Sequence, residues 1–199
     1  MLATFVAGFS LGLSLILAIG SQNAFVLKQG IKRQHVLAVC TVCAISDALL
    51  IALGVAGFGA VVTQFPSIEQ LARYGGAAFL LIYGALSFKS AFTQQHALEA
   101  AENVNASLGK AVLMCLAFTW LNPHVYLDTV ILLGSISTQY HPNQLLFALG
   151  AMSASLVFFY SLGFGSRFLA PLFSQPRAWR ILEFVVGIIM VSIATSLLF

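Results

Sequence analysis

Residues 35–62 read HVLAVCTVCAISDALLIALGVAGFGAVV, and this stretch decides the fold. Across its length, Asp47 is the only Asp, Glu, Lys or Arg. A helix of this length rises about 42 Å, which is enough to cross a hydrocarbon core of about 30 Å with some tilt. The stretch therefore predicts a transmembrane helix that carries one carboxyl group near its middle.

The composition of the whole chain agrees with this stretch. Only 8% of the 199 residues are charged, 60% are hydrophobic and the mean hydropathy is +0.97. Soluble globular domains have about 25% charged residues, so a soluble enzyme and a disordered chain are both excluded. The net charge of +3 comes with no long block of like charge, so no nucleic-acid partner is expected. We expect an integral membrane protein, in contact with the lipid bilayer, that forms a single transmembrane domain over residues 1–199.

Apolar runs predict six transmembrane helices, and hence an all-α fold. Each run has 22 to 28 residues, and none has the weak alternation of barrel strands of about 10 residues. The six runs are residues 2–27, 35–62, 67–88, 110–135, 143–166 and 176–199.

The basic residues predict the orientation of these six spans. Eight of the nine Lys and Arg residues lie in the first, third and fifth loops, and the ninth is Arg73. Cytoplasmic loops are the ones enriched in Lys and Arg. Loops one, three and five are therefore predicted to be cytoplasmic, which puts both termini on the periplasmic side. The eight residues are Lys28, Lys32, Arg33, Lys89, Lys110, Arg167, Arg177 and Arg180.

The two halves of the chain resemble each other. Residues 23–27 (NAFVL) are similar to residues 122–127 (NPHVYL), and Gly57-Phe-Gly59 is similar to Gly163-Phe-Gly165. Three spans in each half would make the halves inverted in the membrane, an arrangement common in secondary transporters. We expect a 3+3 inverted repeat with half-repeats 1–92 and 109–199; the alternative is chance similarity between apolar segments.

Two carboxyl groups fall inside the predicted spans. Asp47 lies about 12 residues into the second span, near the middle of the bilayer, where a charge costs about 2.5–3.5 kcal/mol on insertion scales. Such a group can take up a proton or bind a cation, so it can exchange one for the other. Asp128 lies one helical turn after His124 in the fourth span. It could form an interfacial salt bridge with His124 or act as a second acidic station on the outward path.

Two polar segments interrupt the apolar runs. Asn122-Pro123 lies in the middle of the fourth span, where proline removes a helical hydrogen bond and kinks or breaks the helix. Exposed backbone groups at such a break are tolerated where they line a cavity. Gly20 precedes a polar triplet, Ser21-Gln22-Asn23, towards the inner end of the first span. Gly20 and Pro123 are predicted hinges, and Gln22, Asn23 and Asn122 are predicted to bind substrate.

The cysteines and histidines offer weaker signals. Cys40 and Cys43 have the spacing of a redox motif, which leaves a membrane thiol–disulfide electron carrier as an alternative function. No His spacing typical of a metal site and no phosphate-binding glycine loop is present in the sequence. We therefore expect no metal, no cofactor and no primary ATPase activity.

Three segments carry a resemblance to a known family. They are GSQNAFVLKQG (residues 20–30), Ser46-Asp47 and WLNPHVYLDT (residues 120–129). With them the chain resembles the LysE/ArgO family of basic amino-acid exporters over essentially its whole length, and is most similar to the arginine exporter branch. The resemblance implies a transporter rather than an enzyme, and it implies that Asp47, Asp128 and Asn122-Pro123 are important for function.

The implied activity is export of L-arginine, with L-lysine as a second substrate, from a bacterial cytoplasm across the inner membrane. Proton antiport is the expected mechanism, with Asp47 and Asp128 as proton and substrate sites. Related exporters of threonine or homoserine share the architecture, so export of neutral amino acids is an alternative. The oligomeric state is left open, with a homo-oligomer as one option.

Overall fold

The computed structural model describes residues 1–17, 20–58, 66–92 and 107–198, and every regular element in these ranges is helical. Side chains at 58, 66–69, 71–72 and 174 are outside the description. The longer helices are α1 (Leu2–Ile16), α2 (Ser21–Lys32), α3 (Val36–Leu53), α5 (Pro66–Phe92), α7 (Leu108–Trp120), α10 (Gln144–Gly165) and α11 (Pro176–Leu198). The shorter ones are η1 (Gly54–Phe58), α8 (Pro123–Val125), η2 (Tyr126–Leu133), α9 (Gly134–Ser137), η3 (Thr138–Tyr140), η4 (Ser166–Leu169) and η5 (Leu172–Ser174).

The described part of the chain crosses a membrane several times. Four helical stretches are long and apolar enough to span it: Val36–Gly57, Arg73–Phe92, Gln144–Leu169 and Pro176–Leu198. Helices α1 and α2 would form a fifth span, although their axes differ in direction by 84°. Helix α7 is apolar but has only 13 residues before the chain breaks at Leu121-Asn122. The predicted multi-pass all-helical membrane fold is confirmed, in the coarser form of four to five spans.

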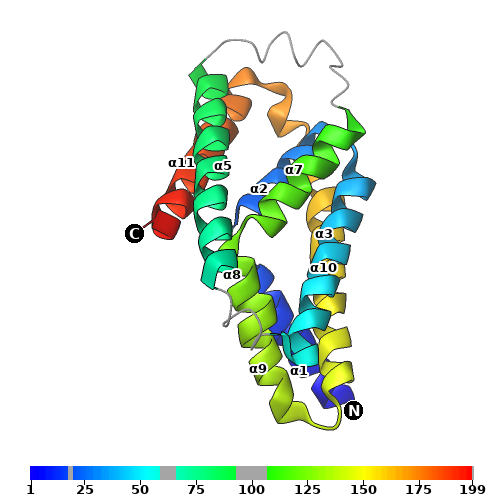
Figure 1. Cartoon of the computed structure of the whole chain (residues 1–199). Coiled ribbons are helices and arrows are strands. Elements are labelled where there is room, and N and C mark those ends of the chain that lie inside the picture. The colour runs from blue at the N-terminus through cyan, green and yellow to red at the C-terminus, as the bar shows by residue number, and fades with distance from the viewer. Residues whose placement is uncertain (18–19, 59–65, 93–106, 199) are drawn as a thin grey trace.

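Helices α5 and α11 form one pair, and α1, α3 and α10 form a second group (Figure 1). Between these groups, α2 and α7 cross the middle of the molecule. The helix termini that flank loops one, three and five all lie at one end of the molecule. The N-terminus of the chain lies at the opposite end.

Small residues bring α1 and α10 into backbone contact. A Cβ atom on Gly8 would overlap the carbonyl oxygen of Phe147, and one on Gly150 would overlap that of Phe5. A Cβ on Gly12 would lie 2.9 Å from the Cα of Ala151. Close packing through small residues is the usual way that helices associate in lipid. This contact holds α10, and the polar Ser155 on it, firmly against the rest of the second group.

Aromatic rings join α2, α5 and α7. The ring of Phe118 on α7 lies 5.3 Å from that of Phe25 on α2. On α5, the rings of Phe79 and Tyr83 each lie 4.9 Å from Phe118. Phe25 and Phe118 are almost fully buried, so this aromatic cluster fills the space between the two helix groups. Along α2 and α7 it lies between the helix breaks and the end that carries the basic residues.

Lys28 and Lys32 lie within helix α2, so the prediction that both are in the first loop is wrong. Helix α2 continues to Lys32, so Lys28 lies inside it, with 14% of its side chain exposed. Its Nζ lies 2.5 Å from Oε1 of Glu183 on α11, whose side chain is 3% exposed. Lys28 remains at the end of the molecule that carries the basic loops, so the predicted orientation does not depend on this correction.

Candidate functional site

The first helix break forms one wall of a cavity. Gly20 has an extended backbone (φ −111°, ψ 174°) and precedes α2, so the chain turns sharply between α1 and α2. Nδ2 of Asn23 donates a hydrogen bond of 2.8 Å to the carbonyl oxygen of Ile16, one of the groups left unpaired at the end of α1. The predicted hinge Gly20 lies at this break, although the sequence predicts residues 2–27 as one span.

The second break is the one predicted at Asn122-Pro123. Helix α7 ends at Trp120, and Asn122 is extended (φ −96°, ψ 107°). Its Oδ1 accepts a 3.2 Å hydrogen bond from the backbone N–H of His124, which caps the next helix, while Pro123 occupies a first-turn position where its missing N–H costs nothing. The hydroxyl of Tyr126 donates to the carbonyl oxygen of Trp120 at 2.8 Å. Side chains therefore satisfy backbone groups on both sides of the break.

A cavity of about 290 Å³ lies where the two breaks meet α3, α10 and α11. This volume is at the lower end of the range of about 300–1,000 Å³ found for small-molecule sites. Leu15, Ile16, Val125, Phe159 and Ile193 supply its apolar walls. Its other lining residues are Gly20, Gln22, Asn23, Asp47, Asn122, His124, Asp128, Thr129 and Ser196.

The cavity thus brings together the residues predicted from sequence to bind substrate or protons. Asp47, Asp128, Asn122, Gln22 and Asn23 all line it, although they come from α2, α3, η2 and the break between α7 and α8. The predicted hinge Gly20 also lines it, and Pro123 is buried directly behind Asn122.

Asp47 is the most buried acid of this group. Only 5% of the residue is exposed, and its Oδ2 accepts a 2.7 Å hydrogen bond from Oγ of Ser155 on α10. Within the described ranges, no Lys, Arg or His nitrogen lies within 4 Å of its carboxyl oxygens. A carboxylate held by one hydroxyl is poorly compensated at this depth, so the group favours taking up a proton or a cationic ligand.

Gln22 supplies a buried amide to the cavity that Asp47 also lines. Its Nε2 is buried and has no hydrogen-bond partner among the residues that the structure describes. A buried unpaired amide is costly unless a ligand satisfies it. The cavity therefore has an acid that can bind a cation and an amide that can donate to a carboxylate.

Asp128 and His124 occupy the more accessible part of the cavity. His124 is exposed and Asp128 is partly exposed. The interfacial salt bridge between them does not form: in the described part of the chain, Lys28–Glu183 is the only ion pair within 4 Å. Asp128 therefore keeps its carboxyl group available to the cavity.

The three cysteines have different partners. Sγ of Cys43 lies 3.0 Å from Sγ of Cys115, whereas the thiol of Cys40 donates to the carbonyl oxygen of Phe159 at 3.2 Å. All three are free and fully buried. Because Cys40 and Cys43 do not face each other, the electron-carrier alternative is not favoured.

Comparison with known proteins decides the family. The sequence model of the LysE type translocators matches residues 13–199. The chain belongs to this family. It is a translocator and not an enzyme, as predicted.

Several relatives are similar over nearly their full length. The arginine exporter protein ArgO of Serratia proteamaculans is 46% identical over 99% of this chain and 97% of the relative. The proteins of the same name from Klebsiella pneumoniae and Pectobacterium carotovorum are 44% and 42% identical, over 99% of this chain and 94% and 97% of their own lengths. No solved structure matches the chain.

Two polar contacts of this LysE family member were not predicted from the sequence, one at the cavity and one away from it. Ser155 is one of three serines in the long apolar helix α10, and it lies 108 residues after Asp47 in the sequence, so no local pattern singled it out. The sequence did not indicate the Lys28–Glu183 pair, because each residue lies near a predicted end of a span, where a charged side chain needs no partner.

Proposed function

We propose that this LysE family member exports L-arginine, with L-lysine as a second substrate, from a bacterial cytoplasm. The observation that carries the proposal is the cavity in which buried Asp47 meets the two helix breaks. A carboxyl group suits a guanidinium or ammonium group, and amide donors suit a carboxylate. The relatives named arginine exporters support the same substrate.

Export of a cation needs an energy source. At about 2.3 kcal/mol per charge per 100 mV, a potential of about 150 mV, negative inside, opposes export of arginine by roughly 3.5 kcal/mol. Exchange of one inward proton for one outward monovalent cation moves no net charge. We therefore assign proton antiport, with Asp47 binding the proton and the cationic side chain in turn.

Each of the other site residues has a role in this scheme. Asp128 is the second acidic station, nearer the accessible part of the cavity. Gln22, Asn23 and Asn122 bind the α-amino and α-carboxylate groups at the two breaks. Gly20 and Pro123 are the hinges about which the half-helices move.

The architecture that we propose for this mechanism has six spans in one domain over residues 1–199. The sixth span is the broken segment of α7, α8, η2 and α9, in addition to the bent pair α1 and α2. Half-repeats 1–92 and 109–199 would be inverted, with Asp47 and Ser155 facing each other across the repeat interface. The protein would lie in the inner membrane with both termini in the periplasm.

Efflux from cells tests the substrate. A strain lacking its own exporters, with and without this protein, is loaded with labelled arginine, lysine and threonine, and their release is measured. Faster release of arginine and lysine, with unchanged release of threonine, is expected. Release of threonine alone would favour the neutral amino-acid alternative. A Cys40→Ser/Cys43→Ser variant should export as the wild type does.

A further inference from the structure

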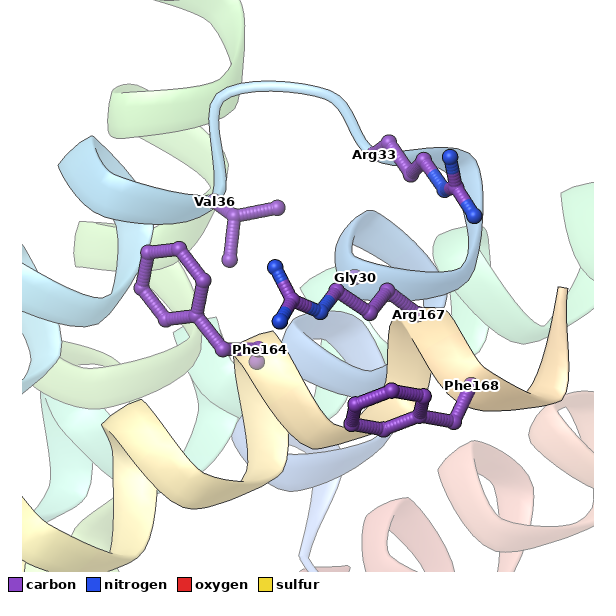
Figure 2. Close-up of a pocket in the computed structure, with 7 residues that line it drawn as sticks. Gly30, Arg33, Val36, Phe164, Arg167 and Phe168 are labelled. Atoms are coloured by element: carbon purple, nitrogen blue, oxygen red, sulfur yellow. The ribbon is translucent and has the colours of Figure 1, made fainter.

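A second pocket of about 440 Å³ lies away from the cavity, at the end of the molecule that carries the basic loops. It is formed where α2 ends, α3 begins and α10 passes into η4. The residues that matter for its chemistry are Arg33, Arg167, Val36, Phe164 and Phe168 (Figure 2).

Two arginines give the pocket its charge. Arg33 follows α2 in the left-handed conformation (φ 55°), and Arg167 follows α10; both are exposed. In the parts of the chain that the structure describes, neither guanidinium has a carboxylate within 4 Å. Figure 2 shows the guanidinium of Arg167 beside the side chains of Val36 and Phe164, whereas the side chain of Arg33 lies on the other side of the chain turn and is directed away from it. The pocket is therefore cationic and suits an anion.

Apolar side chains border these cations. Phe168 is 74% exposed and Phe164 is 37% exposed, at the end of a membrane-spanning helix. The guanidinium carbon of Arg167 lies 5.1 Å from the ring centre of Phe168. A free phosphate ion would use the arginines and leave these rings unused, whereas a lipid would use both. A cationic amino acid is disfavoured by two like charges, so the pocket is unlike the cavity at Asp47.

We propose that this pocket binds one anionic phospholipid. Its phosphate would be held by Arg167, with the exposed Arg33 adding positive charge at the rim of the pocket, and an acyl chain would lie along Phe164 and Phe168. Basic pockets between membrane helices bind anionic lipid headgroups in this way. The site would bridge α2 and α10 at the point where Gly30 packs directly on the Gly163 carbonyl.

Lipid retention by the purified protein tests the proposal. Detergent-solubilised protein is titrated with phosphatidylglycerol, with phosphatidylcholine and with glycerol 3-phosphate, and bound molecules are counted by native mass spectrometry. We expect one saturable phosphatidylglycerol site, and its affinity should fall about tenfold or more in Arg33→Gln/Arg167→Gln. The matched control is Arg177→Gln/Arg180→Gln, which removes the same charge from the same end of the molecule and should keep the wild-type affinity.

Two further variants separate a binding defect from a folding defect. Arg33→Lys/Arg167→Lys keeps the charge and should retain most of the affinity. Phe168→Ser changes only an exposed ring and should weaken phosphatidylglycerol binding several-fold, whereas Leu169→Ser should not. Equal affinity in the Arg→Gln variant and the wild type would overturn the proposal. So would equal binding of phosphatidylcholine, or displacement of the lipid by an equal concentration of glycerol 3-phosphate, which would identify a free-phosphate site.

Discussion

The position of the Asp47 carboxyl group depends on one neighbour, Ser155. The 2.7 Å hydrogen bond from Ser155 is the contact that fixes its carboxyl group, and the Gly8 and Gly12 contacts with α10 keep Ser155 in place. A group with one donor and no counter-ion in the described structure can change its protonation with little rearrangement. That property is what a proton-coupled site requires.

Removing the hydroxyl of Ser155 should impair export without abolishing it. In Ser155→Ala, Asp47 loses its hydrogen bond and the orientation of its carboxyl group, so arginine efflux should fall about three- to tenfold, corresponding to a hydrogen bond of about 1 kcal/mol. Ser153→Ala is the control, because the Ser153 hydroxyl bonds only within its own helix, to the carbonyl of Leu149. Equal efflux rates in the two variants would show that Ser155 does not assist Asp47.

The ion pair between Lys28 and Glu183 should matter for stability. Glu183→Gln leaves a largely buried ammonium group without its carboxylate, which typically costs about 3 kcal/mol or more. We expect a clearly lower Tm for the variant in detergent, measured by thermal unfolding. The apolar double variant Lys28→Met/Glu183→Leu should recover most of the loss, since no charge is then left unpaired. If it unfolds at the same temperature as Glu183→Gln, the loss is one of packing and not of charge.

At the scale of elements, the two helix breaks determine the site. The second break was predicted because proline cannot continue a helix. The sequence predicts a hinge at Gly20 but not the 84° change of direction between α1 and α2, because residues 2–27 contain no proline and read as one apolar run. Gln22 and Asn23, which follow Gly20, line the cavity, and the side chain of Asn23 pairs with the end of α1. A helical pattern gives the length of a span but not the place where it turns.

Helix α5 fixes the position of the second break. A Cβ atom on Gly76 would overlap the carbonyl oxygen of Leu121, whereas one on Gly75 would meet nothing within 4 Å. Gly76→Ala should therefore push the break away from α5, lowering stability by about 1–3 kcal/mol and slowing arginine efflux. Gly75→Ala should leave both unchanged. The comparison of Tm and efflux between these adjacent variants checks the packing directly, and equal behaviour would contradict it.

At the scale of the whole molecule, the composition and loop charges predicted a multi-pass helical membrane protein, and this is confirmed. The cavity could be predicted as a set of residues but not as a shape, because its walls come from segments more than 100 residues apart. Glu69 and residues 93–106, which include Glu99 and Glu102, lie in parts whose side chains the structure does not describe.

The proposed orientation has a direct check. Alkaline phosphatase, which is active only outside the cytoplasm, should be active when fused after Phe199. Green fluorescent protein fused at the same position and exported through the general secretion route should not fluoresce. Fusions within residues 93–106 should give the reverse pattern. A fluorescent C-terminal fusion would place the C-terminus in the cytoplasm and would contradict the proposed orientation.

The central claim is that Asp47 couples proton entry to arginine export. The direct measurement uses purified protein in liposomes loaded with labelled L-arginine, with wild type and Asp47→Asn compared in equal amounts. An acidic exterior should accelerate arginine release through the wild type, a protonophore should cancel this acceleration, and Asp47→Asn should release arginine no faster than protein-free liposomes. Arginine release by Asp47→Asn at the wild-type rate would contradict the role of Asp47. So would a wild-type release rate that does not change with the pH gradient.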